Sequence, residues 1–87
     1  MISEPVTKPL VAQVAHELDA HQTYLGISLH FERENLRGWA KLFRDQSIEE
    51  AGHAAKLTTF LIDNEVAFSL PQVGVASTAY GSAREAV

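Results

Sequence analysis

Five side chains stand at spacings that would let them bind a cation and do chemistry on it. Glu50 and His53 are three positions apart, so on a helix they share one face and can converge on one ion. Glu17 and Tyr24 are two helical turns apart, and Glu49 directly precedes Glu50. The sequence contains no cysteine, which excludes thiolate metal sites, disulfides and thiol nucleophiles. A metal ion would therefore be held by carboxylate oxygens and imidazole nitrogens.

Two helices are expected to carry these residues. Between Pro9 and Asn64 the sequence has no proline, and apolar residues return every three or four positions, which is helical periodicity. The apolar pattern loses its phase in the charged stretch 33–37, where we predict a reversal of the chain. We therefore predict an all-α fold, an antiparallel hairpin with helices at about residues 8–34 and 36–64.

The boundaries of this hairpin rest on weaker signals. Asn35 is suited to cap the N-terminus of the second helix. Residues 65–87 contain Pro71 and lose helical spacing, so we expect an irregular tail within the same single domain, 1–87. Near its end, Ser82 and Glu85 have the spacing of a capping box, which predicts the start of another helix.

The centre of each apolar stripe is polar. If the chain folds back at residue 35, Glu17 and His53 both lie about 27 Å from the turn and Glu50 about 22 Å, from the rise of a helix. Carboxylates facing a core need a proton or a cation as partner, and neither stripe offers lysine or arginine at its centre. The sequence therefore predicts a metal site in this layer.

The other residues of the stripes have simpler interpretations. His21 lies one turn after Glu17, and we expect a hydrogen-bonded histidine of the core or beside the site rather than a ligand. His16 and His30 fall off the stripe and are expected to be exposed. We predict that the remaining large residues of the second stripe form core: Trp39, Phe43, Leu57 and Phe60.

A hairpin with one apolar stripe per helix cannot cover itself, so we predict that a second copy completes a four-helix bundle by homodimerisation. The dimer would contain Glu17, Glu50 and His53 twice. Its four carboxylates, with a charge of about −4, would balance two divalent ions. Homodimers or larger even-numbered homo-oligomers are the expected assemblies.

Composition excludes several other functions. The net charge is −4 and the seven lysines and arginines are scattered, so a nucleic-acid partner is not expected. No segment approaches the roughly 18 uninterrupted apolar residues of a membrane span, and no signal peptide is evident. We expect a cytoplasmic protein without a membrane partner.

The segments 17–24, 31–39 and 43–54 resemble the first two helices of bacterial ferritins, over roughly residues 10–80. The resemblance is carried by Glu-x6-Tyr, by Gln-x2-Glu-Glu-x2-His and by the distance between these elements. The Glu-x-x-His pattern is already known from metal sites of ferritin-like bundles. Family members supply two further helices that this sequence lacks, which argues against a self-contained site and against the family's usual 24-subunit cage.

The resemblance implies a role for each candidate residue. Glu17 would be a terminal iron ligand, Glu50 a bridge between two irons and His53 a nitrogen ligand. Tyr24 would be a hydrogen-bond or electron donor beside the site, and Glu49 would assist iron passage. Haem is not expected, since haem-carrying ferritins have a methionine in the second helix where this sequence has Ala51 and Gly52.

The residues and the resemblance together predict a di-iron ferroxidase that oxidises Fe(II) with oxygen or hydrogen peroxide. Iron storage is a weaker expectation than oxidation, because a dimer encloses no cavity unless it assembles into a shell. Each residue also has a purely structural interpretation: an exposed helix pair for Glu50 and His53, a hydrogen-bonded carboxylate for Glu17, a core tyrosine for Tyr24 and a solvated side chain for Glu49. For the whole chain, the alternatives are a non-catalytic helical dimerisation module, whose polar layer fixes register, and a truncated ferritin without activity.

Overall fold

The structure, a computed structural model, describes residues 4–81 and consists of two antiparallel helices and an extended tail. Helix α1 spans Glu4–Arg33 and helix α2 spans Arg37–Asp63, and no strand occurs in the described part. The hairpin is long and narrow, 48 × 19 × 16 Å. The all-α prediction is confirmed, and α1 begins four residues earlier than predicted, continuing through Pro9. Ser82 and Glu85 lie outside the described residues.

Both helices end in the same motif, which also forms the turn. The N–H of Leu36 donates to the carbonyl of Phe31 (2.9 Å), around Asn35 in the left-handed region at φ 60°. At the end of α2, the N–H of Val66 donates to the carbonyl of Leu61 (3.0 Å), around Glu65 at φ 58°. These are Schellman motifs. The prediction that Asn35 caps α2 is wrong: Asn35 terminates α1, since asparagine tolerates this conformation, and α2 starts after Leu36 without a side-chain cap.

The main apolar core lies at the turn end of the hairpin. Ile27, Phe31 and Ala40 are buried there, with Tyr24, Phe43 and Tyr80 packed against them. The rings of Phe31 and Phe43 stack at 5.6 Å between centroids. Smaller contacts continue up the hairpin through Val14, Ala54 and Leu61, which are also buried. This packing fixes the register of α1 against α2.

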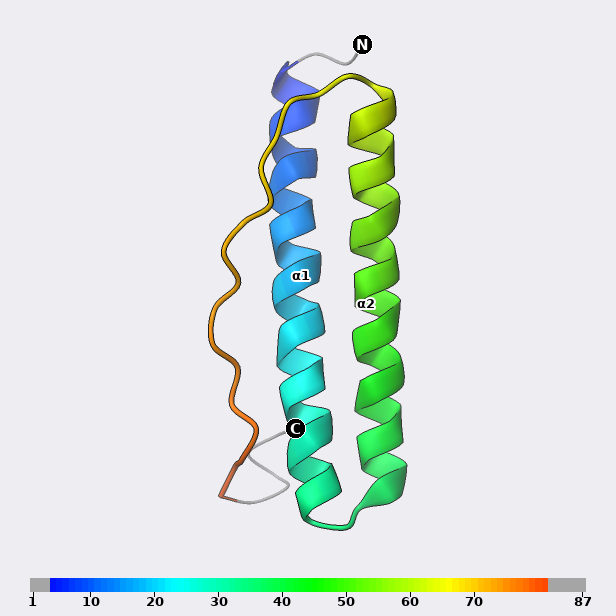
Figure 1. Ribbon diagram of the computed structural model, residues 1–87, viewed down its shortest axis with the longest axis vertical. Coiled ribbons are helices and arrows are strands. Elements are labelled where there is room, and N and C mark those ends of the chain that lie inside the picture. Colours follow the sequence, from blue (N-terminus) through cyan, green and yellow to red (C-terminus); the bar gives the residue numbers. More distant parts are fainter. Residues whose placement is uncertain (1–3, 82–87) are drawn as a thin grey trace.

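The tail runs back along α1, so that α1 lies between α2 and the tail (Figure 1). A methyl group added at Gly26 would collide with the backbone carbonyl of Ser77, so this glycine permits the close approach of the tail. His30 was predicted to be exposed, which is wrong: it is buried, because Tyr80 covers it. The N–H of Tyr80 donates to His30 Nδ1 (2.9 Å), and the two rings meet edge to face.

One face of the hairpin stays open. Trp39 is 50% exposed and Phe60 45%, whereas Phe43 and Leu57 are half-buried, so the prediction that all four are core is wrong for the single chain. The physical reason is that two helices can bury only the sides that face each other. No helix in the described part is long and apolar enough to cross a membrane.

Candidate metal centre

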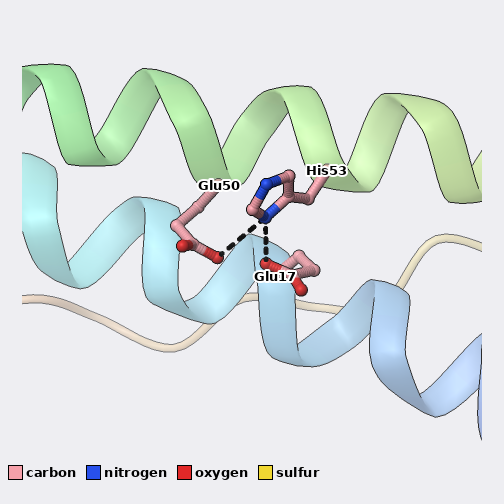
Figure 2. A group of neighbouring side chains, drawn as sticks. All are labelled: Glu17, Glu50 and His53. Carbon is pink, nitrogen blue, oxygen red and sulfur yellow. Dashed lines mark ion pairs between the residues drawn. The ribbon is translucent and has the colours of Figure 1, made fainter.

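The antiparallel packing of α1 and α2 brings Glu17, Glu50 and His53 together midway along the hairpin (Figure 2). His53 Nδ1 lies 3.5 Å from Glu17 Oε2 and 3.7 Å from Glu50 Oε2. Each residue offers one ligand atom, and the three atoms lie within 4.8 Å of one another. Two carboxylates and one imidazole are a donor set suited to a divalent transition metal.

Glu17 and Glu50 shift each other's pKa in opposite directions. The hydrogen bond with Glu17 is the main cause that raises the pKa of Glu50, and desolvation adds to it. The same hydrogen bond lowers the pKa of Glu17, with a further contribution from Gln13. A cation bound between the two carboxylates would compete with protons for them, because carboxylates bind metal ions in their deprotonated form.

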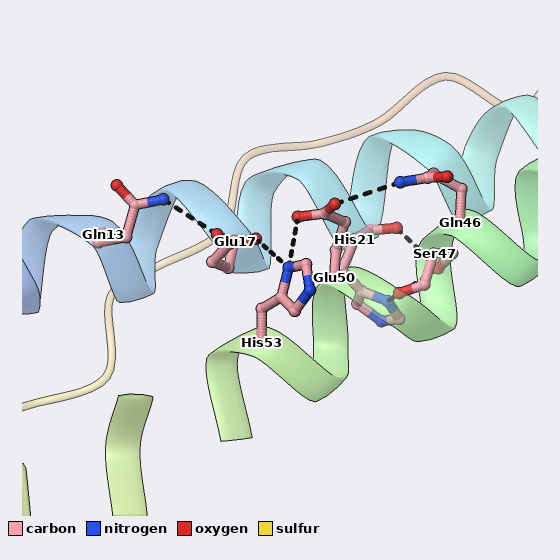
Figure 3. Close-up of polar contacts among 7 residues, drawn as sticks. All are labelled: Gln13, Glu17, His21, Gln46, Ser47, Glu50 and His53. Atoms are coloured by element: carbon pink, nitrogen blue, oxygen red, sulfur yellow. Dashed lines mark hydrogen bonds and ion pairs between the residues drawn. The ribbon is translucent and has the colours of Figure 1, made fainter. Parts of the chain in front are cut away.

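Each carboxylate is also oriented by a glutamine one helical turn before it (Figure 3). The amide of Gln13 donates to Glu17 Oε1 (2.9 Å), and the amide of Gln46 donates to Glu50 Oε1 (3.3 Å). These contacts leave the other oxygen of each carboxylate, the one nearer His53, free of the glutamine. The two pairs therefore favour orientations in which both carboxylates face the same point.

His21 lies beside this group and contacts α2 directly. Its Nδ1 lies 2.9 Å from the backbone oxygen of Ser47 and 2.8 Å from the Ser47 hydroxyl. Ser47 is buried, and His21 is half-buried. His21 therefore has the hydrogen-bonded position expected from the sequence and does not join the three-residue group.

The group is open on one side. A pocket of about 280 Å³ is lined by Gln13, His16, Glu17, Ala20 and Glu50. The side chains of Glu17 and Glu50 are only 14% and 16% exposed, whereas that of His53 is 46% exposed. A cation can therefore reach the carboxylates from solvent, and the hairpin leaves room for ligands from elsewhere.

Two predicted site residues lie apart from the group. Tyr24 belongs to the apolar core, where its ring packs 6.0 Å from that of Phe43. Glu49 is exposed on α2. The roles in electron donation and iron passage that the resemblance implies for these residues stay predictions.

Sequence reasoning missed Gln13 and Ser47. The i, i+4 spacing of Gln13 and Glu17 is a signal that could have found the first, since such pairs face each other on a helix. Ser47 carries no signal of its own. It is found only by counting back from the turn, because Ser47 and His21 lie at similar distances from residue 35 on opposite helices.

Comparison with known proteins gives consistent results. A family profile described as "Ferritin-like domain" matches residues 7–87. The chain is 32% identical over 85 residues to a "Bacterial non-heme ferritin" of Bacteroides fragilis, covering 98% of this chain and 54% of that protein. It is 33% identical over 75 residues to "Bacterioferritin BfrB" of Mycobacterium tuberculosis, covering 86% of this chain and 41% of that protein.

A solved structure, "Humanized Archaeal ferritin", superimposes with a TM-score of 0.88 at 26% identity, covering 99% of this chain and 52% of that chain. The chain thus spans about half the length of the relatives that it matches.

Proposed function

Because the chain belongs to the ferritin-like family, we propose that it binds Fe(II) at Glu17, Glu50 and His53 and oxidises it to Fe(III). The observation that supports this most strongly is the convergence of these three side chains, with ligand atoms within 4.8 Å, from two facing helices. Hard carboxylate oxygens stabilise the higher charge of Fe(III), and imidazole is a suitable ligand for iron.

The proposal includes a second copy of the chain. Three ligand atoms leave the coordination of an iron ion incomplete, and the group is open toward one side. The hairpin also exposes three large apolar side chains that share one side of α2 and that a second hairpin would cover: Trp39, Leu42 and Phe60. A homodimer would provide two equivalent groups, and its four carboxylates would balance the charge of two Fe(II) ions.

The proposed reaction is a two-electron oxidation shared by two irons. Each Fe(II) gives one electron, and one O2 with two protons accepts both electrons to form H2O2. When hydrogen peroxide is the oxidant, it takes two electrons and two protons and forms two waters. Two metal ions held about 3.5–4 Å apart can deliver their electrons to one oxidant, which is the advantage of bridging carboxylates.

Other parts of the proposal follow from the family and the sequence. Oxidised iron would contribute to iron storage where the chains assemble further, and haem takes no part. The larger assembly would have an even number of chains. A cytoplasmic location stays a prediction.

Anaerobic titration with Fe(II) tests the binding step of the proposal, and the absorbance of Fe(III) after oxygen is admitted tests the oxidation. We expect about two irons per dimer, and a melting temperature that rises with Fe(II), because the ion binds the native state. Glu50→Gln should abolish this binding. Asp63→Asn is the control, since it removes one carboxylate charge from an exposed position at the end of α2, and it should keep the stoichiometry.

Unchanged iron stoichiometry in Glu50→Gln would contradict the site. A chain that dimerises without binding iron would instead support the dimerisation module. Heterogeneous aggregates in sedimentation, in place of a compact even-numbered oligomer, would support the truncated ferritin.

A further inference from the structure

Next to the proposed iron site, His21 of α1 and Ser47 of α2 are joined by reciprocal contacts (Figure 3). His21 Nδ1 lies 2.9 Å from the Ser47 carbonyl oxygen and 2.8 Å from the Ser47 hydroxyl. In return, the Ser47 hydroxyl donates to the His21 carbonyl oxygen (3.0 Å). Each side chain thus binds the backbone of the opposite helix, so the pair connects the two helices themselves and not only their side chains.

These contacts determine where the hydrogens are. A carbonyl oxygen can only accept, so His21 Nδ1 must carry a hydrogen. The Ser47 hydroxyl uses its own hydrogen on the His21 carbonyl and can accept from Nδ1. The neutral Nδ1–H form of His21, whose one hydrogen is shared between the two Ser47 oxygens, therefore fits all three contacts of this part-buried pair. No other neutral form of histidine achieves this.

The His21–Ser47 pair lies next to the proposed metal ligands on both helices. His21 is one helical turn from Glu17 on α1, and Ser47 is one turn from Glu50 on α2. We propose that His21 and Ser47 are positioning residues that hold α1 and α2 at the separation required for Glu17, Glu50 and His53 to share a cation. The inference rests on the proposed function, since it describes how that same site is kept in shape.

The surrounding packing explains why a dedicated link is needed. The aromatic core lies toward the turn. Near His53, Ala54 is the one buried apolar residue of α2 in the described part of the chain. Between these regions two carboxylates face each other across the helices. Once both are ionised they repel, which acts to widen the gap. Ligand sets tolerate displacements of only about 0.5 Å, so a link one turn away determines whether the three donors converge.

Two substitutions at His21 separate this inference from simple loss of packing. The amide nitrogen of His21→Asn stands at the same number of bonds from the backbone as Nδ1, so it can still donate to the Ser47 carbonyl. The amide nitrogen of His21→Gln corresponds to Nε2 and cannot. Both are polar and uncharged, and glutamine is the better helix former of the two, so weaker binding by His21→Gln cannot come from a poorer helix. Ser47→Ala removes the return hydrogen bond from the other helix.

Co(II) binding, followed by its d–d absorption, is the measurement, because this spectrum reports coordination geometry as well as affinity. We expect His21→Gln and Ser47→Ala to weaken Co(II) binding by about tenfold, the lower end of the range for residues around a metal site, because neither contacts a ligand directly, and to change the spectrum. His21→Asn should stay within about threefold of the wild-type affinity and keep the wild-type spectrum.

Ile27→Val is the control for stability alone. It removes one methyl group from the buried core near the turn, and it should lower the melting temperature without changing the Co(II) spectrum. The inference is overturned if His21→Gln binds Co(II) with wild-type affinity and spectrum. It is also overturned if His21→Asn loses as much Co(II) affinity as His21→Gln although circular dichroism shows that it is folded. Wild-type and Glu50→Gln proteins that bind Co(II) alike would instead overturn the proposed function, and the inference with it.

Discussion

The turn end and the middle of the hairpin are built on different physical principles. At the turn, Phe31 is 1% exposed and stacks on Phe43, so stability there comes from burial of apolar surface. In the middle, Glu17 and Glu50 face each other across the same two helices, and the cross-helix contacts are polar. The same helix pair thus contains one region that stabilises the folded state and one in which two carboxylates destabilise it when both are ionised. The stability of the hairpin therefore comes mainly from packing several turns away from the site.

The largest expected effect tests the stabilising region. Phe31→Ala should lower the free energy of unfolding by about 3–5 kcal/mol, because it removes a buried ring and leaves a cavity. Urea denaturation followed by helical circular dichroism, at fixed protein concentration, measures the loss. A loss below about 1 kcal/mol would show that the turn end is not the main source of stability.

Gly26→Ala tests whether the tail is part of this stabilising region. The added methyl group would meet the backbone carbonyl of Ser77, which cannot rotate away as a flexible side chain can. We expect a net loss of about 1–3 kcal/mol, typical of overpacking, despite the better helix propensity of alanine. Hydrogen exchange of the Tyr80 amide, which donates to His30, reports displacement of the tail. A stabilised variant with full Tyr80 protection would contradict this contact.

The pH dependence of stability tests the repulsion between the Glu17 and Glu50 carboxylates in the middle of the hairpin. Since the pKa of Glu50 is raised in the folded chain, folding binds its proton more tightly, and stability should fall as pH rises from the ordinary glutamate value through the raised pKa. The amide of Glu50→Gln can still donate to Glu17 and carries no charge. This variant should therefore match the metal-free wild type near pH 4 and melt at a higher temperature at pH 7.

The measurement for this comparison is thermal unfolding across that pH range in the presence of a chelator. Glu49→Gln, on the exposed side of α2, is the control and should not show the same difference. Equal pH dependence in wild type and Glu50→Gln would mean that the two carboxylates do not oppose each other.

The two regions also differ in how well the sequence predicts them. The meeting of Glu17, Glu50 and His53 follows from helical rise and one turn position, which are local quantities. The burial of His30 does not, because it depends on a tail with no periodic pattern that returns 50 residues later in the chain. Asn35 was misassigned because the same residue type favours both the start of one helix and the end of another.

The exposed Trp39 and Phe60 show a different limit. Their spacing correctly places them on one stripe, but periodicity alone does not say whether the cover comes from the same chain or from another. The stripe therefore predicts burial, and the single hairpin leaves these residues exposed.

The smallest expected effect concerns Gly52, which lies between Glu50 and His53 and has no atom within 4 Å of an added Cβ. Gly52→Ala should raise the free energy of unfolding by about 0.5–1 kcal/mol, because alanine loses less backbone entropy in a helix. Denaturation of the metal-free protein measures the gain. If stability rises and Fe(II) affinity is unchanged, Gly52 is not needed for the site. A fall in stability would instead indicate that a second chain packs closely against Gly52, as the Ser77 backbone packs against Gly26 within the chain.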